Sequence, residues 1–162
     1  MLIVGAGLIG SELANDLALG GHRITLLDTQ PEPLACWQGE QAGAQLLDAW
    51  KDLSNRFVGG VQVAQVEQLG GHYRVTTADG QRFAADQVIA AAGLATPSRL
   101  AESSGLAWDQ GIAVDAATLC TSVEHIHALG DSIPVNGQAS RYIEPIARQV
   151  RVKTTSHPMT LH

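Results

Sequence analysis

The chain has 162 residues, of which 45% are hydrophobic and 16% charged, a composition typical of a globular protein and not of a disordered one. Its length suits one domain, or one and a half, around a hydrophobic core. The formal net charge of −6 argues against nucleic acid or an anionic membrane surface as the binding partner.

The sequence predicts neither a membrane segment nor a disulfide framework. The apolar run near the start is far shorter than the roughly 20 residues of a membrane span, and no basic segment precedes it. Cys36 and Cys120 are far apart and form no Cys-x-x-Cys pair, so we expect both to be small buried side chains. These features favour the cytoplasm as the location.

The first 28 residues carry the clearest pattern in the chain. Residues 2–4 predict a buried strand, and Gly5, Gly7 and Gly10 form a Gly-x-Gly-x-x-Gly turn that leads into a helix. In such a turn the first glycine permits the sharp bend, the second lets the backbone approach a pyrophosphate, and the third lets the helix pack closely on the strands. The pyrophosphate would lie at the helix N-terminus, where free N–H groups and the helix dipole favour negative charge.

The helix after the glycine turn has two stripes at a spacing of four residues. One stripe is apolar and the other is small, and together they predict the face that packs on the strands. Their members are Ile9, Leu13 and Leu17 in the apolar stripe and Gly10, Ala14 and Ala18 in the small one. Gly20-Gly21 is expected to end the helix.

Asp28 follows the second predicted strand, residues 24–27. A carboxylate at this point, about twenty residues after the glycines, accepts hydrogen bonds from an adenosine ribose diol. No Arg occurs in residues 29–33 that could neutralise a 2′-phosphate. The sequence therefore favours NAD over NADP.

The middle of the chain predicts a second helix, a third strand and a β-meander. Residues 41–53 have a helical apolar face, and residues 56–58 have the pattern of a short parallel strand. Alternating apolar residues then surround two turns, Gly70-Gly71 and Asp79-Gly80, which predicts three antiparallel strands. The face of the second helix is formed by Leu46, Ala49, Trp50 and Leu53, with Trp50 expected in the core.

Residues 86–92 predict another buried strand, which ends at Gly93. A short helix is expected at 97–104, and strands are expected at 111–115 and 125–129. His125 and His127 would share one face of the last strand, but no third ligand accompanies them at a suitable spacing, so no metal site is expected. The expected fold class is α/β: a Rossmann-like doubly wound parallel sheet with an inserted three-stranded antiparallel β-meander, plus part of an FAD-binding domain.

Four features follow one another along the chain. The first is the glycine turn with Glu12 after it, and the second is Asp28. The third is the apolar strand that ends at Gly93, and the fourth is Thr121 followed by a strand into Gly130-Asp131. With the segments GAGLIGSELAND, HIHALGDS, NGQASRYIEPIARQ and RVKTTSHPMTL, this order resembles the FAD-dependent NAD(P)H oxidoreductases that have two dinucleotide-binding domains. These enzymes form the pyridine nucleotide-disulfide oxidoreductase superfamily, and the rubredoxin reductases within it resemble the chain most.

The resemblance implies a set of cofactor-binding residues for NAD(H) and FAD, and it assigns no catalytic side chain. It assigns Gly5, Gly7, Gly10 and Asp28 to the binding of NAD. It puts Glu12, Asp131, Ile143 and Lys153 near FAD, Ile143 through its backbone. The set is completed by Ala6, Leu8, Ile9, Gly93 and Gly130.

The activity implied is electron transfer from NADH through flavin to rubredoxin or a similar iron-containing carrier. Ferredoxin, nitrite and coenzyme A disulfide reductases of the same architecture stay open as alternatives, as does a standalone NAD-binding, redox-sensing module without catalysis. A thioredoxin-reductase-like enzyme is disfavoured, because its Cys-x-x-Cys pair would lie in this nucleotide domain.

The resemblance also divides the chain into three parts. Residues 1–114 would be the NAD(H)-binding domain, residues 115–149 the C-terminal part of an FAD-binding domain, and residues 150–162 the start of an interface domain. The family opens with its own FAD-binding βαβ unit, which has no counterpart here, so we expect a fragment that is incomplete for catalysis and that retains NADH but not FAD.

Overall fold

The computed structural model describes residues 1–35, 40–135, 138–139 and 146–151. The chain divides into two compact units, Met1–Gly93 and Leu94–His162. Among the described residues, every helix is too short or too polar to span a bilayer. The predictions for Cys36, Ile143 and Lys153 concern residues outside the described part.

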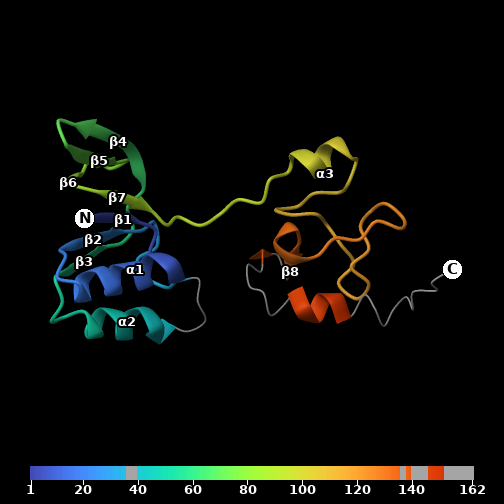
Figure 1. Ribbon diagram of the computed structural model, residues 1–162, viewed down its shortest axis with the longest axis horizontal. Coiled ribbons are helices and arrows are strands. Elements are labelled where there is room, and N and C mark those ends of the chain that lie inside the picture. The colour runs from blue at the N-terminus through green and yellow to red at the C-terminus, as the bar shows by residue number, and fades with distance from the viewer. Residues whose placement is uncertain (36–39, 136–137, 140–145, 152–162) are drawn as a thin grey trace. The chain divides into compact units, whose positions relative to one another are not determined.

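The first unit is built on a parallel sheet with the strand order β3-β2-β1-β7. The first strand lies inside the sheet, where Ile3 pairs with Leu26 on one side and with Ile89 on the other. This arrangement follows from the short apolar segments that the sequence predicted as buried strands (Figure 1). Their bounds are β1 Leu2–Val4, β2 Ile24–Leu27, β3 Asn55–Val58 and β7 Val88–Ala90.

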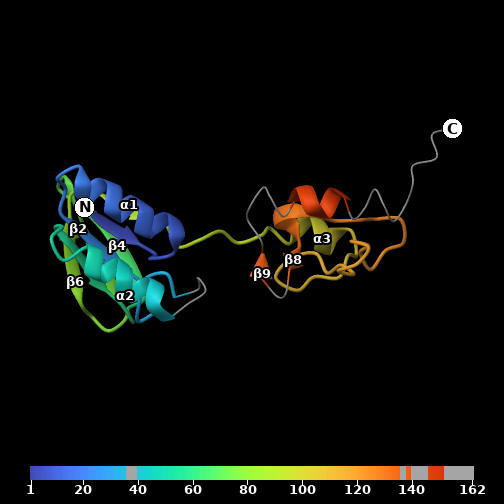
Figure 2. The same cartoon turned by 90° about the horizontal axis from the view of Figure 1, so that it is seen from below.

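Helices α1 (Leu8–Leu19) and α2 (Glu40–Ala49) cover one face of this sheet, as Figure 2 shows from the side of the helices. Alternate strand residues point to opposite faces, so Ile3 and Leu26 reach the helices while their neighbours point away. The helix α1 buries its small stripe, including Ala14 and Ala18. Small side chains permit a close approach of helix to sheet.

The expected apolar stripe of α1 is only partly correct. Leu13 and Leu17 are half-buried and pack on the core, but Ile9 is 60% exposed. Ile9 lies in the first turn, where the helix projects past the end of the strands toward the crevice described below. The glycine pair ends α1 as predicted, with Gly21 in the left-handed region and the N–H of His22 donating to the Leu17 carbonyl.

The second helix is shorter than predicted, because it ends at Ala49 and not at residue 53. Turns follow it, since the chain has to reverse before it enters β3 at Asn55. Trp50 is buried in the core as expected, and its indole Nε1 donates to the Asn15 side chain at 3.3 Å. Ala49 was expected on the buried face and is exposed.

The predicted meander covers the other face of the parallel sheet. Its strands are antiparallel and pair in the order β4-β5-β6, with turns at the two expected glycine positions. Val75 is fully buried in a second core with Leu2 and Leu27, the strand residues that point away from the helices. The bounds are β4 Val63–Leu69, β5 His72–Thr77 and β6 Arg82–Ala85.

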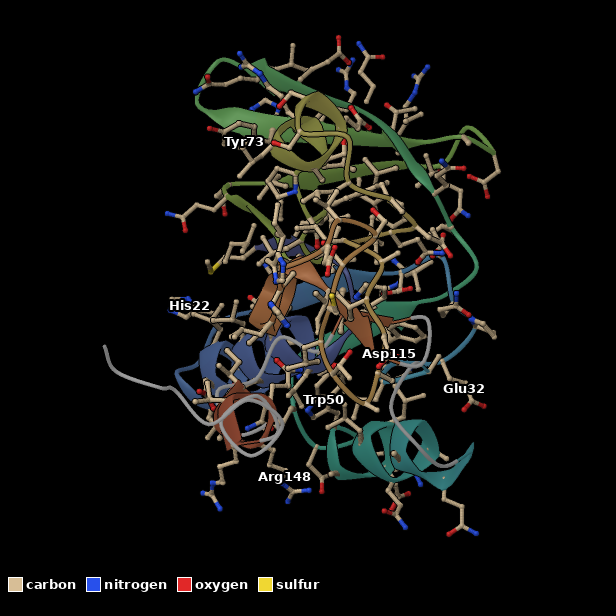
Figure 3. All side chains as sticks on the ribbon, turned by 90° about the vertical axis from the view of Figure 1, so that its right-hand side faces the viewer. His22, Glu32, Trp50, Tyr73, Asp115 and Arg148 are labelled. Carbon is tan, nitrogen blue, oxygen red and sulfur yellow. The ribbon has the colours of Figure 1, made fainter. Side chains whose placement is uncertain are left out.

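The α/β fold class is therefore confirmed, with the meander and the helices on opposite faces of one sheet. Figure 3 shows the two layers by their side chains, with Tyr73 on the meander and Trp50 at the helices. The loops that leave the carboxyl ends of β1 and β2 lie at one edge of this sheet. That edge is where ligands bind in open α/β sheets.

The second unit has little regular structure in its described part. The predicted strands at 111–115 and 125–129 are wrong, because those segments form only isolated bridges. The bridges pair Trp108 with Ile112, Val114 with Thr121 and Cys120 with His127. His125 has φ of 65°, which breaks an extended strand, so His125 and His127 do not share a strand face. The elements present are α3 Arg99–Ser103, a 3-10 turn Gly130–Ser132, β8 Pro134–Val135, β9 Gln138–Ala139 and a helical segment at 146–151.

The boundary between the compact units lies between Gly93 and Leu94 in the sequence, earlier than the predicted domain boundary at 114/115. The strand β7 completes the parallel sheet and its cores. After it, Leu119, Ala128 and Ile133 form a separate small core. Residues 94–114 therefore belong to the second compact unit. Which cofactor each unit binds stays a prediction.

Candidate nucleotide-binding site

A crevice of about 380 Å³ opens at the carboxyl ends of β1 and β2 in the first unit. It is bounded by the glycine turn, the start of α1, the segment after β2 and the residues that follow β7. Its lining includes Gly5, Ala6, Gly7, Leu8, Ile9, Asp28 and Gly93 from the predicted cofactor set.

Two of the three glycines in the turn are required by packing within the protein. A Cβ on Gly5, which has φ of 102°, would lie 2.4 Å from the Ala91 carbonyl oxygen. A Cβ on Gly10 would lie 1.8 Å from the Gly5 carbonyl oxygen, so any side chain there would separate α1 from β1. Gly10 does not line the crevice and acts by letting helix and strand approach.

Gly7 differs from the other two glycines of the turn. A Cβ at Gly7 would meet no protein atom within 4 Å, and its φ of −69° is open to any residue. The fold itself therefore does not require glycine at this position. A bound group that approaches the backbone closely would require it, which is the role that the sequence predicted for Gly7.

The N-terminus of α1 presents an uncapped positive end to the crevice. Gly7 is the N-cap residue, no side chain caps the helix, and no acidic residue lies in the first turn. The first N–H groups of a helix have no intrahelical acceptor, and the helix dipole adds partial positive charge there. This end is suited to a phosphate or pyrophosphate group.

The carboxylate of Asp28 lies between the glycine turn and the loop that follows β2. Its Oδ2 accepts a hydrogen bond from the Ala6 N–H, and its Oδ1 accepts one from the Gln30 N–H at 2.8 Å. A carboxylate offers roughly four acceptor positions, so capacity is left for ribose hydroxyls. Asp28 thus links the glycine turn, where a pyrophosphate is expected, to the expected ribose position.

The charge of the crevice favours a ribose without a 2′-phosphate. The charged side chains in its described lining are the carboxylates of Asp28 and Glu32, with no Lys, Arg or His among them. A 2′-phosphate would meet these carboxylates with no cation to neutralise it. The structure therefore fits NAD(H) better than NADP(H).

Sequence reasoning missed Ser11, which is buried next to the small stripe of α1. Its hydroxyl donates to the Ala6 carbonyl at 3.1 Å, and the Leu34 N–H donates to the same oxygen at 2.8 Å. Together with Asp28, these groups bind both the N–H and the carbonyl of Ala6. The available signal was a single polar residue next to the small stripe.

In the second unit, the Gly130-Asp131 turn is held by side-chain hydrogen bonds to its backbone. The Gly130 N–H donates to Gln149 Oε1 at 2.7 Å, and the Thr96 hydroxyl donates to the Asp131 carbonyl at 3.1 Å. Gly130 has φ of 72°, and a Cβ there would lie 3.4 Å from Ile146 Cδ1. The Asp131 residue is exposed.

The predicted site residues thus separate into groups. The residues assigned to NAD surround one crevice in the first unit or, for Gly10, support it. Glu12 is exposed on α1 and does not line that crevice. Gly130 and Asp131 form the turn in the second unit, and Ile143 and Lys153 lie outside the described residues.

A glycine turn, an uncapped helix and an acid after the second parallel strand define a dinucleotide-binding unit of the Rossmann class. The chain belongs to the pyridine nucleotide-disulphide oxidoreductase family, whose family model matches residues 1–157. This membership confirms the predicted superfamily, and with it NAD(H) and FAD as the cofactors typical of such proteins.

The rubredoxin-NAD(+) reductase of Acinetobacter baylyi is 39% identical over 168 residues, which cover 99% of this chain and 42% of that protein. A protein of Aeromonas salmonicida named nitric oxide reductase FlRd-NAD(+) reductase is 40% identical over 147 residues, 90% of this chain and 38% of that protein. The chain therefore spans about two fifths of the length of these relatives.

Among solved structures, the ferredoxin reductase for the CYP199A2 system of Rhodopseudomonas palustris superimposes with a TM-score of 0.82. Its sequence identity is 24%, and the match covers 95% of this chain and 40% of that chain. At this identity the likeness supports the fold.

Proposed function

We propose that the chain is part of an FAD-dependent oxidoreductase that takes electrons from NADH and passes them through flavin to rubredoxin or a similar small iron-containing carrier. The relatives of 39–40% identity support this proposal, since both carry names of NAD(+) reductases and one name includes rubredoxin. The expected cytoplasmic location belongs to the same proposal.

The observation that carries the proposal is the open space at Gly7 beside an uncapped helix N-terminus. NADH fits this arrangement, with its pyrophosphate at the α1 N-terminus and its adenosine ribose at Asp28. The nicotinamide half would extend toward Ala91–Gly93, at the other side of the crevice. Leu8 and Ile9 would contribute backbone N–H groups at the start of α1, whereas the N–H of Ala6 is bonded to Asp28.

The second unit contributes to the FAD side in this proposal. Asp131 would bind the ribitol and phosphate part of FAD, with Gly130 providing the turn. Glu12, Ile143 and Lys153 are assigned near FAD by the family resemblance alone. The proposed division is an NAD(H)-binding domain at 1–114, an FAD-side segment at 115–149, and the start of an interface domain at 150–162.

In this class of enzyme, NADH supplies a hydride to the flavin, and the flavin passes the two electrons one at a time to iron carriers. In this proposal the residues of this chain bind NADH and orient it. Asp28 would bind the ribose and the glycine turn would hold the pyrophosphate, with Leu8 and Ile9 lining the crevice beside them.

The test is NADH binding by the purified full chain, which is measured by NADH fluorescence and by equilibrium dialysis. We expect Gly7→Ala to leave thermal unfolding unchanged, because its Cβ meets no protein atom, and to weaken NADH binding about tenfold or more. Gly20→Ala, at the other end of α1, is the matched control and should bind as the wild type does. A wild type that does not bind NADH, or a Gly7→Ala variant of undiminished affinity, would refute the NADH site.

The electron acceptor is tested with the protein purified from its natural source. Its NADH-dependent reduction of rubredoxin, ferredoxin and coenzyme A disulfide is compared under the same conditions. The proposal expects rubredoxin to be reduced fastest. NADH binding without reduction of any acceptor would favour the redox-sensing module.

A further inference from the structure

Residues 29–35, which follow Asp28, form one wall of the crevice. Thr29, Gln30, Glu32 and Ala35 all line the space. Asp28, which precedes this wall, is the residue expected to bind the adenosine ribose. The adenosine end of a dinucleotide would therefore lie against this wall, and the nicotinamide half would lie away from it.

The wall lies against two glycines that do not line the crevice. A Cβ on Gly43, within α2, would lie 2.6 Å from the Pro33 carbonyl oxygen. A Cβ on Gly59, directly after β3, would lie 2.6 Å from the Pro31 carbonyl oxygen and 2.7 Å from that of Gln30. These distances are too short for real atoms, and the contacted atoms are backbone, so a side chain at either glycine would displace the wall.

The wall is also stiff and anchored at both ends. The Gly60 N–H donates to the Gln30 carbonyl at 3.0 Å, and the Leu34 N–H donates to the Ala6 carbonyl at 2.8 Å. Pro31 and Pro33 restrict the backbone between these anchors. Since neither Gly43 nor Gly59 lines the crevice and the wall does, a side chain at either glycine would displace the wall toward the crevice.

We propose that Gly43 and Gly59 are positioning residues of the nucleotide site, because the absence of a side chain at each lets the wall at 29–35 lie back and keeps the adenosine end of the crevice open. Glycine is unfavourable in a helix interior, so its presence at position 43 in α2 is consistent with a demand of this kind. This inference rests on the proposed function, NADH binding by the first unit.

The experiment uses the purified full chain with two probes. ADP-ribose carries the adenosine end and the pyrophosphate, whereas reduced nicotinamide mononucleotide (NMNH) lacks the adenosine. Calorimetry measures ADP-ribose, and NMR titration measures the weaker NMNH. We expect Gly43→Ala and Gly59→Ala each to weaken ADP-ribose binding about tenfold or more and to leave NMNH affinity within about twofold.

Gly20→Ala is the control for a glycine-to-alanine change in the same unit, and it should alter neither affinity. Unchanged ADP-ribose affinity in folded variants would overturn the inference, as would an equal loss for both probes. A wild type that binds neither probe would instead refute the proposed NADH site.

A measurement on the wild type keeps the inference testable if the variants do not fold. Because the wall is seated before nucleotide arrives, the amides of Leu34 and Gly60 should exchange slowly with deuterated solvent in the nucleotide-free chain. Exchange as fast as in an unstructured peptide would show that the wall is not held in advance, and the inference would be wrong.

Discussion

The two compact units differ in what holds their functional turns. In Met1–Gly93, continuous ladders of a parallel sheet and an antiparallel meander support the glycine turn, with a core on each face of the parallel sheet. In the described part from Leu94 on, the chain pairs mostly through isolated bridges around one small core. Three residues there adopt a left-handed backbone without being glycine: Gln110, Leu119 and His125.

This difference shows two ways of fixing a binding turn. The glycine turn of the first unit is held by close backbone packing at Gly5 and Gly10, in addition to side-chain bonds to Ala6. The Gly130-Asp131 turn is held by single side-chain bonds, from Thr96 and to Gln149. We therefore expect the first unit to be the more stable of the two, which the first two of the following variants test.

The largest effect is expected from Gly10→Ala. The new Cβ would lie 1.8 Å from the Gly5 carbonyl oxygen, and this backbone atom cannot move without breaking the turn. We expect a loss of about 4 kcal/mol or more in the free energy of unfolding, which is in the exceptional range for single substitutions. Urea denaturation measures it, with Gly20→Ala as the control. A loss below about 1 kcal/mol would contradict the close packing of α1 on β1.

Ile133→Ala tests the second unit, because Ile133 is fully buried in its small core. We expect a loss of about 3 kcal/mol, within the range for a buried isoleucine. Single-tryptophan variants separate the units: Trp108 reports on the second and Trp50 on the first. The transition seen by Trp108 should shift more than that seen by Trp50. Equal shifts would mean that the units unfold together.

Asp28→Ala removes the acceptor of the Ala6 and Gln30 N–H groups as well as the expected ribose contact. NADH affinity should fall by about tenfold or more, the scale of a lost charged hydrogen bond. Fluorescence titration with NADH measures it. Asp52→Ala, an exposed acid after α2, is the control and should bind NADH normally. Equal affinities of the two variants would remove Asp28 from the site.

The smallest effect concerns the turn between β5 and β6. Hydrogen bonds from the Thr77 hydroxyl, and next from the Gln81 side-chain amide, lower the pKa of Asp79 below its ordinary value. A pKa that is lower in the folded state adds stability above the unfolded-state pKa, and this stability is lost as the pH falls through the folded-state pKa.

Thr77→Val removes the first of these bonds. Between about pH 5 and pH 2.5, the melting temperature should therefore fall more steeply in the wild type than in Thr77→Val. Thr76→Val, on the outward side of the same strand, is the control and should keep the slope of the wild type. Parallel pH profiles for the wild type and Thr77→Val would exclude this contribution.

The sequence by itself was sufficient for the order of elements in the first unit. The glycine turn, Asp28 after the second strand, and the meander turns at Gly70-Gly71 and Asp79-Gly80 all depend on local chemistry, namely side-chain periodicity and the backbone freedom of glycine. The predictions for 111–115 and 125–129 were wrong because short apolar segments form strands only when partners are available to pair with them.

Only the tertiary structure decided which glycines of the turn are required by packing and which has open space beside it. Gly7 and Gly10 belong to one motif, yet a Cβ at the first meets open space and a Cβ at the second meets backbone. The placement of Gly43 and Gly59 behind the wall of the crevice joins segments that are distant in the sequence. Such contacts depend on how helix, strand end and loop pack together, and that packing has no periodicity from which a sequence pattern could predict it.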